Sequence, residues 1–251
     1  MKWPGVQAVV FDLDDTLCAY WDACKSALRE TFTRIPIEDH EPKRMMQHWA
    51  ASFQVFGRDL KAGGWYETYL KTGEPTRTEQ MRLTLERVGI EDLALAKRLS
   101  ATYAELRNND LRLFDDALEI LTELKAKYPL GMITNGPADI QRQEVTTLGL
   151  EPYFQSILIE GEQGLGKPHE EVFRTSERDL GASAEGMVMV GNSYKHDIKA
   201  SMAAGWRAIW IRRPSDVPPS AGEDGKPEEK PAGDPDPHAI IHRLSELKSL
   251  L

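Results

Sequence analysis

The sequence predicts an α/β protein with a Rossmann-like, doubly wound parallel sheet core and an inserted all-α helical bundle. Three observations lead to this fold class. Short apolar runs recur without polar alternation, helical patterns separate the later runs, and helical patterns alone follow the first run. A chain of 251 residues has room for one large domain, or for a core and a smaller module.

Five short apolar runs are predicted to be buried strands, and a weaker sixth run follows them. Because their apolar character is continuous, we expect a parallel sheet that is covered on both faces. The expected strands are Ala8–Phe11, Leu130–Ile133, Ser156–Ile159, Met187–Val190 and Arg207–Ile211, with Ala239–Ile241 as the sixth.

Helical patterns lie between the later runs. Such β-α-β-α alternation is typical of a doubly wound fold, in which ligands bind at the carboxyl ends of the strands. Asp12, Thr134 and Asn192 are expected at this edge of the sheet. The predicted helices are Asp115–Lys127, Ala138–Leu148, Glu170–Leu180 and Asp197–Ala204.

The segment 18–111 has no convincing strand and reads as several amphipathic helices with breaks near residues 35–36, 63–64, 73–75 and 89. An insertion after the first strand is expected above the carboxyl edge of the sheet, as a cap. We therefore predict a core domain of residues 1–17 and 112–251 and an α-helical cap domain of residues 18–111. The large aromatic side chains of the cap are expected in the interior of its bundle: Trp21, Trp49, Phe53, Phe56 and Trp65.

Composition excludes several classes of function. The formal net charge is −9 at pH 7, and no basic patch suited to nucleic acid is present. The N-terminus lacks a signal-peptide apolar region, and no run is long enough to span a membrane. Cys18 and Cys24 fit neither a redox motif nor a zinc site, so we expect a reduced, cytoplasmic protein. The acidic, Pro- and Gly-rich segment 214–237 is predicted to be a mobile loop, too poor in apolar residues to pack.

The first candidate site follows the first strand. Asp12 and Asp14 are spaced i, i+2, and Thr16 comes next. Alternate residues of a strand point the same way, so these carboxylates are expected close together beside Thr16. Two nearby carboxylates need a cation or a shared proton. The pair suits a divalent metal, an Asp nucleophile and an Asp acid/base, although an Asp-rich turn after a strand would look the same.

Two further segments offer anion-binding groups. The strand ending in Thr134-Asn135-Gly136 places a hydroxyl, an amide and backbone N–H groups at a helix start, a good place for a phosphate. Lys167 follows a Gly-rich approach and precedes Pro168, which suits a first helical position. The same run fits a P-loop except that Pro168 replaces the required Ser or Thr, so we reject that interpretation.

The fourth segment joins the strand ending at Val190 to a helix through a short polar turn. Asn192 directly follows the glycine of this turn, and Asp197 opens the predicted helix. Asp197 is either a plain N-cap residue or a contributor to a metal shell.

In this order, the four segments resemble the haloacid dehalogenase (HAD) superfamily. The match covers about Val6–Leu17 and Leu113–Arg212, and the helical insertion is similar to the α-helical cap of that family. The half of the chain from Met132 to Ile211 further resembles N-acylneuraminate-9-phosphatases and related nucleotidases.

The resemblance implies a role for each matching residue. Asp12 would attack phosphorus and form an aspartyl-phosphate, and Asp14 would protonate the leaving oxygen and then activate water. Thr134, Asn135 and Lys167 would hold the transferring phosphoryl group. Mg²⁺ would bind through residues of the first and fourth segments: Asp12, Asp14 (through its carbonyl), Asn192 and Asp197.

One position departs from the family pattern. Many family phosphatases carry an acidic, metal-binding residue directly after the glycine of the fourth segment, and here that residue is Asn192. A neutral amide oxygen still coordinates a cation, but it removes one negative charge from the shell. The substitution bears on metal affinity more than on activity, and Asp197 remains to compensate.

We therefore expect Mg²⁺-dependent hydrolysis of a small phosphorylated metabolite, of the sugar phosphate or nucleoside monophosphate class. The alternatives are a phosphomutase of the same fold and a catalytically silent phosphometabolite-binding module; dehalogenase chemistry is disfavoured because that branch lacks the Asp14 partner. No nucleic-acid or membrane partner is expected, and the oligomeric state stays open. The candidate specificity residues are Arg58, Lys61, Trp65 and Arg77. A solvated helix face would explain the presence of the charged ones equally well.

Overall fold

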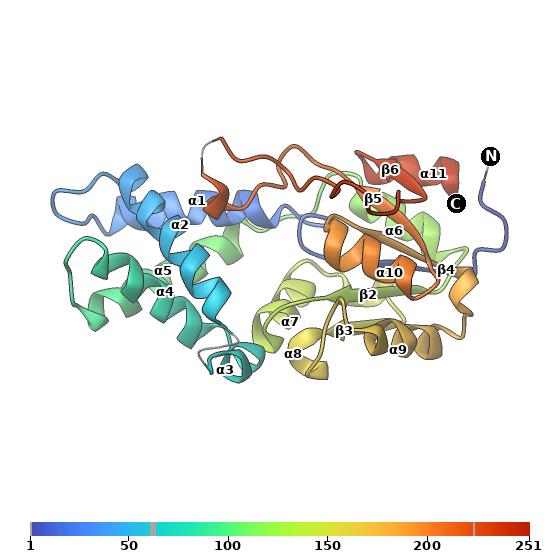
Figure 1. The fold of residues 1–251 in the computed structure, drawn as a ribbon, viewed down its shortest axis with the longest axis horizontal. Coiled ribbons are helices and arrows are strands. Elements are labelled where there is room, and N and C mark those ends of the chain that lie inside the picture. The colour runs from blue at the N-terminus through green and yellow to red at the C-terminus, as the bar shows by residue number, and fades with distance from the viewer. Residues whose placement is uncertain (1, 61–63, 223) are drawn as a thin grey trace.

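The computed structural model describes residues 2–60, 64–222 and 224–251, and its strands form one parallel sheet (Figure 1). The strand order is β3-β2-β1-β4-β5-β6, and every neighbouring pair is parallel. The sheet confirms the predicted fold class. Its strands are Ala8–Phe11 (β1), Leu130–Thr134 (β2), Ser156–Ile159 (β3), Met187–Gly191 (β4), Arg207–Ile211 (β5) and Ala239–Ile241 (β6).

Both faces of the sheet are covered, as the continuous apolar runs predict. Val9 and Phe11 of β1 belong to one buried cluster, which includes the apolar residues of helix α6. Ala8 and Val10 point to the opposite face and join a second cluster with helix α9. The alternation of side chains along one strand therefore serves two cores. The helices of this part are Ala117–Lys125 (α6), Ala138–Thr147 (α7), Glu160–Gln163 (α8), Glu170–Leu180 (α9), Ala200–Ala203 (α10) and Leu247–Leu250 (α11).

The predicted start of the helix after β4 is wrong, and so is the expected place of Pro168 at a first helical position. The helix after β4 begins with a π-helical turn at Tyr194–Lys199, and Ser193 is its N-cap residue. Asp197 therefore lies inside the helix and is not an N-cap, because the Ser193 side chain accepts the His196 N–H instead. Helix α9 begins at Glu170, so Pro168 lies before the helix rather than at its first position.

The segment 18–111 is helical and has a hydrophobic core of its own, separate from the clusters on the sheet. Figure 1 shows its helices gathered at one end of the molecule, away from the sheet. The two connections to the sheet run side by side, since Ala19 N donates to Arg112 O (2.9 Å) and Phe114 N donates to Leu17 O (3.0 Å). The helices are Tyr20–Arg34 (α1), Pro42–Asp59 (α2), Tyr66–Lys71 (α3), Glu74–Glu86 (α4) and Leu93–Asp110 (α5).

The acidic segment 214–237 packs by polar contacts, contrary to the expectation that it is too poor in apolar residues to pack. Gln54 of α2 donates to Ser220 O (2.7 Å), and the Tyr194 hydroxyl donates to Pro235 O (2.6 Å). Glu228 accepts from Tyr194 N at 2.8 Å. The segment thus contacts both the helical part and the turn after β4, because its carboxylates and carbonyl groups meet donors there.

No helix in the described ranges combines the length and the apolar character that crossing a bilayer requires.

Candidate active site

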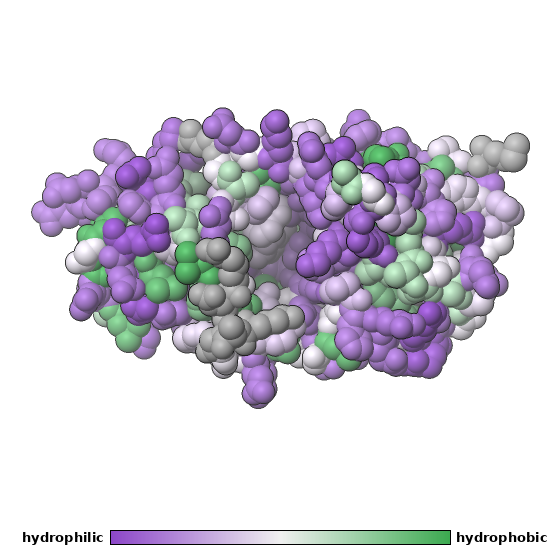
Figure 2. Space-filling view, in the orientation of Figure 1, coloured by the Kyte–Doolittle hydropathy of each residue, from purple (hydrophilic) through white to green (hydrophobic). Residues whose placement is uncertain are grey.

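A cavity of about 410 Å³ lies between the carboxyl edge of the sheet and the helical segment. Figure 2 shows a hollow between the two halves of the molecule. The cavity brings together residues from all four segments singled out in the sequence: Asp12, Asp14, Thr134, Asn135, Lys167, Asn192 and Asp197.

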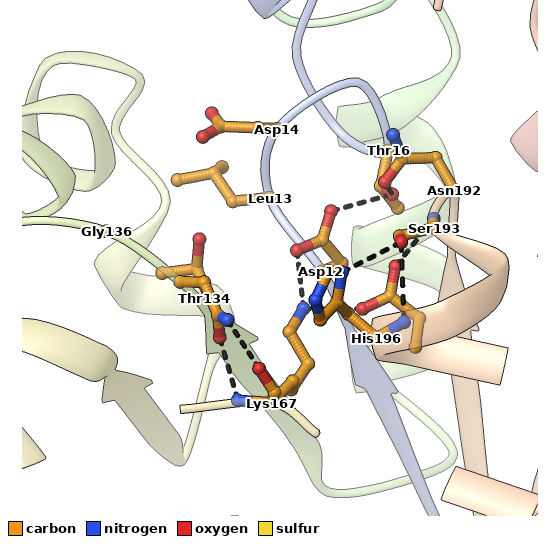
Figure 3. A network of polar contacts seen from close by, with 12 residues as sticks. Asp12, Leu13, Asp14, Thr16, Thr134, Gly136, Lys167, Asn192, Ser193 and His196 are labelled. Carbon is orange, nitrogen blue, oxygen red and sulfur yellow. Dashed lines mark hydrogen bonds and ion pairs between the residues drawn. The ribbon is translucent and has the colours of Figure 1, made fainter. Parts of the chain in front are cut away.

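Asp12 lies at the core end of this cavity and is only 7% exposed. Its Oδ1 atom contacts Lys167 Nζ at 2.6 Å, and its Oδ2 atom accepts the Thr16 hydroxyl at 3.0 Å (Figure 3). Burial raises the pKa of Asp12 to about 6, and the Lys167 ammonium opposes that rise. The pairing with a cation favours the ionised, nucleophilic form of the carboxyl group.

Both the side-chain ammonium and the backbone of Lys167 are held by neighbouring groups. Its Nζ atom lies 2.6 Å from Asp12 Oδ1 and 2.6 Å from Asp197 Oδ1. Its backbone N donates to Asn135 Oδ1 (2.8 Å), and its carbonyl accepts from Asn135 Nδ2 (2.7 Å). Burial would lower the pKa of Lys167, but the two carboxylates outweigh it and raise the pKa, so the amine is charged. The Asn135 side chain thus holds the loop of Lys167.

Asp14 points away from Asp12, although the i, i+2 spacing predicts that the two carboxyl groups point the same way (Figure 3). Strand β1 ends at Phe11, so strand alternation no longer applies at Asp14. Its Oδ2 atom accepts from Gln141 Nε2 of α7 at 3.0 Å. Burial, followed by the charge of Asp12, raises the pKa of Asp14 to about 6. A carboxyl group with this pKa both donates and accepts a proton near neutrality.

Gln141 connects several groups around Asp14. Its Oε1 atom accepts the Thr134 hydroxyl at 2.5 Å, and its Nε2 atom also donates to Glu144 Oε2 at 3.0 Å. Glu144 in turn lies 3.5 Å from the Arg107 guanidinium of α5. This chain of contacts links the helical segment to the acid/base candidate.

Asn192 also lines the cavity near Asp12 and contacts further polar side chains. The Asn192 amide donates to Asp216 Oδ2 (3.0 Å), and its Oδ1 atom accepts from the Thr16 hydroxyl (3.3 Å). Burial raises the pKa of Asp216 to about 6, and burial together with the charges of Asp216 and Asp14 raises the pKa of Asp15 to about 9. The carboxyl groups of Asp15 and Asp216 thus lie in a region with too little cationic charge to neutralise them.

These oxygen atoms fit a Mg²⁺ ion that keeps several waters. Among the described residues, no group of three or more His, Cys, Asp or Glu side chains forms a complete metal cage. Mg²⁺ in phosphoryl-transfer sites binds through one or two carboxylates and completes its shell with water and phosphate oxygens. Asp12 and Asn192 supply oxygens on one side of the pocket. Both oxygens of Asp197 are engaged, with Lys167 Nζ and with Ser193 N (2.9 Å), so its place in a metal shell stays a prediction.

Sequence reasoning missed Gln141, Glu144 and Asp216. Gln141 and Glu144 share one face of α7 at i, i+3 spacing, and both are at most 2% exposed. Two buried polar residues on one helix face after a candidate strand are the signal that points to such a pair. For Asp216, the sequence offers no comparable signal, since it lies in the acidic segment.

The aromatic residues of the helical segment are placed differently from the prediction. Trp49 is buried in the bundle, but Trp21, Trp49, Phe53 and Phe56 all line the cavity, and Phe53 is 36% exposed. The expectation of a place in the bundle interior is confirmed for Trp49, which also lines the cavity, whereas Phe53 is exposed. Of the specificity candidates, Arg77 lines the cavity, whereas Lys61 and the side chain of Arg58 lie outside the described residues.

Comparisons with known proteins agree with this geometry. The family model for haloacid dehalogenase-like hydrolases matches residues 9–211. N-acylneuraminate-9-phosphatase of Mus musculus is 25% identical over 98% of this chain and 94% of its own length. Glyceraldehyde 3-phosphate phosphatase of Methanothermobacter thermautotrophicus is 28% identical over 82% of this chain and 85% of its own.

A solved structure of a HAD-hydrolase from Bacillus subtilis, bound to magnesium, superposes with a TM-score of 0.71 at 24% identity, covering 97% of both chains. This likeness shows the shared fold. The family model matches well over half of the sequence and includes the strands that carry Asp12, Thr134 and Asn192. The protein belongs to the haloacid dehalogenase-like hydrolases.

Proposed function

We propose that this protein hydrolyses the phosphate monoester of a small metabolite with Mg²⁺, through an aspartyl-phosphate on Asp12. The observation that carries the proposal is the buried pair of Asp12 and Lys167, with a second carboxyl group, Asp14, of raised pKa at the same cavity. The names of the two relatives describe phosphatases that act on small phosphorylated compounds.

In the first step, an Asp12 oxygen forms a bond to phosphorus while the bond from phosphorus to the ester oxygen breaks. Asp14 gives its proton to the departing oxygen. In the second step, Asp14 takes a proton from water as the water oxygen attacks phosphorus, and Asp12 is released. Lys167 orients Asp12 and neutralises phosphoryl oxygens, and the Thr134 hydroxyl lies within the same pocket.

When bound, Mg²⁺ would neutralise the phosphoryl oxygens and the carboxylates around them. Asp12, the Asp14 carbonyl and Asn192 would hold the ion, with Asp197 acting on it directly or through Lys167. Gln141 keeps Asp14 oriented, because its amide donates to Asp14 Oδ2 at 3.0 Å.

We further propose the division into a core of residues 1–17 and 112–251 and a cap of residues 18–111. The separate hydrophobic core of the helical segment supports this division. The cap touches the core closely at Gly161, where a Cβ would lie 2.1 Å from Leu70 O and 2.2 Å from Ala138 N. The Tyr66 hydroxyl of α3 also donates to Glu160. A cap in this place would keep bulk water from the phosphorylated Asp12 while admitting the water molecule that attacks it.

The test is phosphate release from a panel of sugar phosphates, nucleoside monophosphates and phosphorylated acids, with Mg²⁺ and with EDTA. We expect Mg²⁺-dependent release from a subset, and loss of at least about 10³-fold in Asp12→Asn. Asp115→Asn, an exposed residue outside the cavity, is the matched control and should retain activity. Reactions in ¹⁸O-water distinguish hydrolysis, which labels the phosphate, from phosphoryl transfer between substrate positions. Absence of release with every compound, or full activity in Asp12→Asn, contradicts the proposal.

A further inference from the structure

The part of the cavity that is lined by Arg77 and by other residues of the helical segment is called the helical end below. Its side chains differ from those around Asp12 and can bind a different part of a substrate. This inference rests on the proposed phosphatase function. We propose that the group esterified to the phosphate carries a second anionic group, which Arg77 of α4 binds, and an apolar part that the aromatic walls contact. The substrate class is thus a phosphomonoester of an organic acid, or a bisphosphate, rather than a phosphate ester of a neutral alcohol.

Arg77 carries a guanidinium whose inner nitrogen atoms have no partner. Its Nε and Nη1 atoms are inaccessible to solvent and make no hydrogen bond with any described residue. No ion pair to Arg77 is formed within the described ranges either, whereas Lys167, the cation at the core end, touches two carboxylates. Buried donors are nearly always satisfied in proteins, so each exception calls for an explanation, and a bound anion supplies one here. Arg77 as a whole is only partly buried and lines the cavity, so a bound molecule can reach the outer part of its guanidinium.

The space for this guanidinium depends on a glycine. A Cβ at Gly73 would lie 2.7 Å from Arg77 Nη1 and 2.0 Å from Ile140 Cδ1. Gly73 and Ile140 line the cavity together with Arg77. The absence of a side chain at Gly73 therefore lets Arg77 fold back beside Ile140.

Charged groups of both signs lie near Arg77. Arg107 also lines it, with its Nε atom unpaired and its Nη2 atom 2.8 Å from Asn108 Oδ1. Glu144 lies 3.5 Å from Arg107. Asp139 already accepts the Thr72 hydroxyl at 2.8 Å and Gly73 N at 3.0 Å. Two guanidinium groups and two carboxylates therefore lie near this end, and within the described ranges neither carboxylate forms an ion pair with Arg77.

The cavity wall also carries apolar side chains. Trp49 and Phe53 stack with ring centroids 5.0 Å apart. Because one cavity offers the phosphoryl-binding groups, an unpaired guanidinium and apolar walls, it matches a molecule with a phosphate, an apolar part and an acid. The aromatic and aliphatic lining residues are Trp21, Trp49, Phe53, Phe56, Tyr69 and Ile140.

The experiment compares three series of esters at matched chain lengths from three to six carbons: alkyl phosphates, ω-carboxyalkyl phosphates and α,ω-alkane bisphosphates. The readout is the ratio of kcat/KM for each charged ester to that of its alkyl counterpart. A charge-assisted pair predicts a ratio of about 10 to 100 at the best-fitting length. The series that gives the higher ratio identifies the anion as a carboxylate or a phosphate.

Variants assign this ratio to Arg77. In Arg77→Met the ratio should fall towards one, and Arg77→Lys should restore part of it. Arg82→Met is the matched control on the same helix, because Arg82 pairs with Glu79 and Glu86 outside the cavity, and it should keep the wild-type ratio. A ratio near one at every length in the wild type, or a ratio that survives in Arg77→Met, overturns the inference.

Binding separates this inference from the proposed function. Calorimetric titration with ω-carboxyalkyl and alkyl phosphonates, which are not hydrolysed, gives the same comparison without turnover. Hydrolysis without any preference for charged esters removes the inference and leaves the phosphatase. Absence of turnover with tighter binding of the carboxylated phosphonate, lost in Arg77→Met, supports the recognition site and removes the phosphatase. Equal binding of both phosphonates overturns the inference whatever the turnover.

Discussion

The two ends of the cavity differ in how their buried cation is paired. At the core end, Lys167 lies between Asp12 and Asp197, with both contacts at 2.6 Å. At the helical end, Arg77 lies beside apolar side chains, and its buried Nε and Nη1 atoms make no hydrogen bond to any described residue. At the core end the cation Lys167 is fully paired, whereas Arg77 at the helical end can still accept an anion.

This difference separates chemistry from selection. The phosphoryl group is common to all substrates of such a site, so the groups that act on it are built into the ends of buried strands. The remainder of the substrate varies, and the side chains that meet it come from helices with a core of their own. Binding energy from that remote part can orient the ester for reaction.

The largest expected effect comes from removing the paired cation. Lys167→Met leaves Asp12 and Asp197 buried without their partner, and breaking a buried pair in this way costs about 3–5 kcal/mol of the free energy of unfolding. Arg77→Met is the matched comparison, because it removes a guanidinium whose buried nitrogen atoms have no partner. It should leave the free energy of unfolding unchanged or raise it by about 1 kcal/mol. Urea titration of both variants measures the two changes.

Equal destabilisation by the two substitutions would contradict the contrast between the ends. Since Lys→Met and Arg→Met both keep an apolar stem of similar length, loss of packing does not explain a difference between them. Activity gives a second readout: Lys167→Met should lose kcat on every ester, whereas Arg77→Met should lose kcat/KM mainly on charged ones.

An intermediate effect is expected from pH. Burial raises the folded-state pKa of Asp216 from 3.8 to about 6. The folded protein therefore binds this proton more tightly than the unfolded chain does, and the resulting stability is lost as the pH rises from about 4 through 6. In EDTA, Asp216→Asn should gain about 2–3 kcal/mol relative to wild type between pH 4 and pH 7. Denaturant titrations at several pH values measure the difference.

Asp115→Asn serves as the control, because this exposed carboxyl group lies outside the cavity and its substitution should give a difference that is flat with pH. Added Mg²⁺ should reduce the Asp216 effect, since a cation at the core end offsets the carboxylate charge. A gain that shrinks with rising pH would show that the core end does not carry excess negative charge.

The sequence predicts the core end better than the helical end for a physical reason. Asp12, Thr134 and Asn192 follow apolar strands, and parallel strands place their carboxyl ends at one edge. Asp14 is predicted less well, because it lies beyond the end of β1, where the loop and its contact with Gln141 set its direction.

The helical end depends on packing between helices that are far apart in the sequence. The periodicity of α2 shows that this helix has an apolar face, but not that Trp49 and Phe53 line one cavity with Arg77 of α4. In the sequence, Arg77 looks like any charged residue of a solvated helix. Its unpaired, solvent-inaccessible nitrogen atoms become visible only when the fold places it beside Gly73 and Ile140.

The smallest expected effect concerns the neutral residue at the core end. Asn192→Asp adds a carboxylate near Asp12 and should tighten Mg²⁺ binding by about tenfold, or about 1.4 kcal/mol, because the shell gains a charge. The same change replaces the amide that donates to Asp216 at 3.0 Å by a repelling group. The variant should therefore be less stable than wild type in EDTA and recover in Mg²⁺.

Calorimetric titration with Mg²⁺ measures the affinity without turnover. Asn109→Asp, an exposed position on α5, adds the same charge outside the cavity and should leave the affinity unchanged. Unchanged or weaker binding in Asn192→Asp would mean that repulsion from Asp216 cancels the added charge, and Asp216→Asn in the same background would then restore the gain. If neither variant binds Mg²⁺ more tightly, residue 192 does not contact the ion, and Asp12 and the Asp14 carbonyl remain as the proposed ligands at the core end.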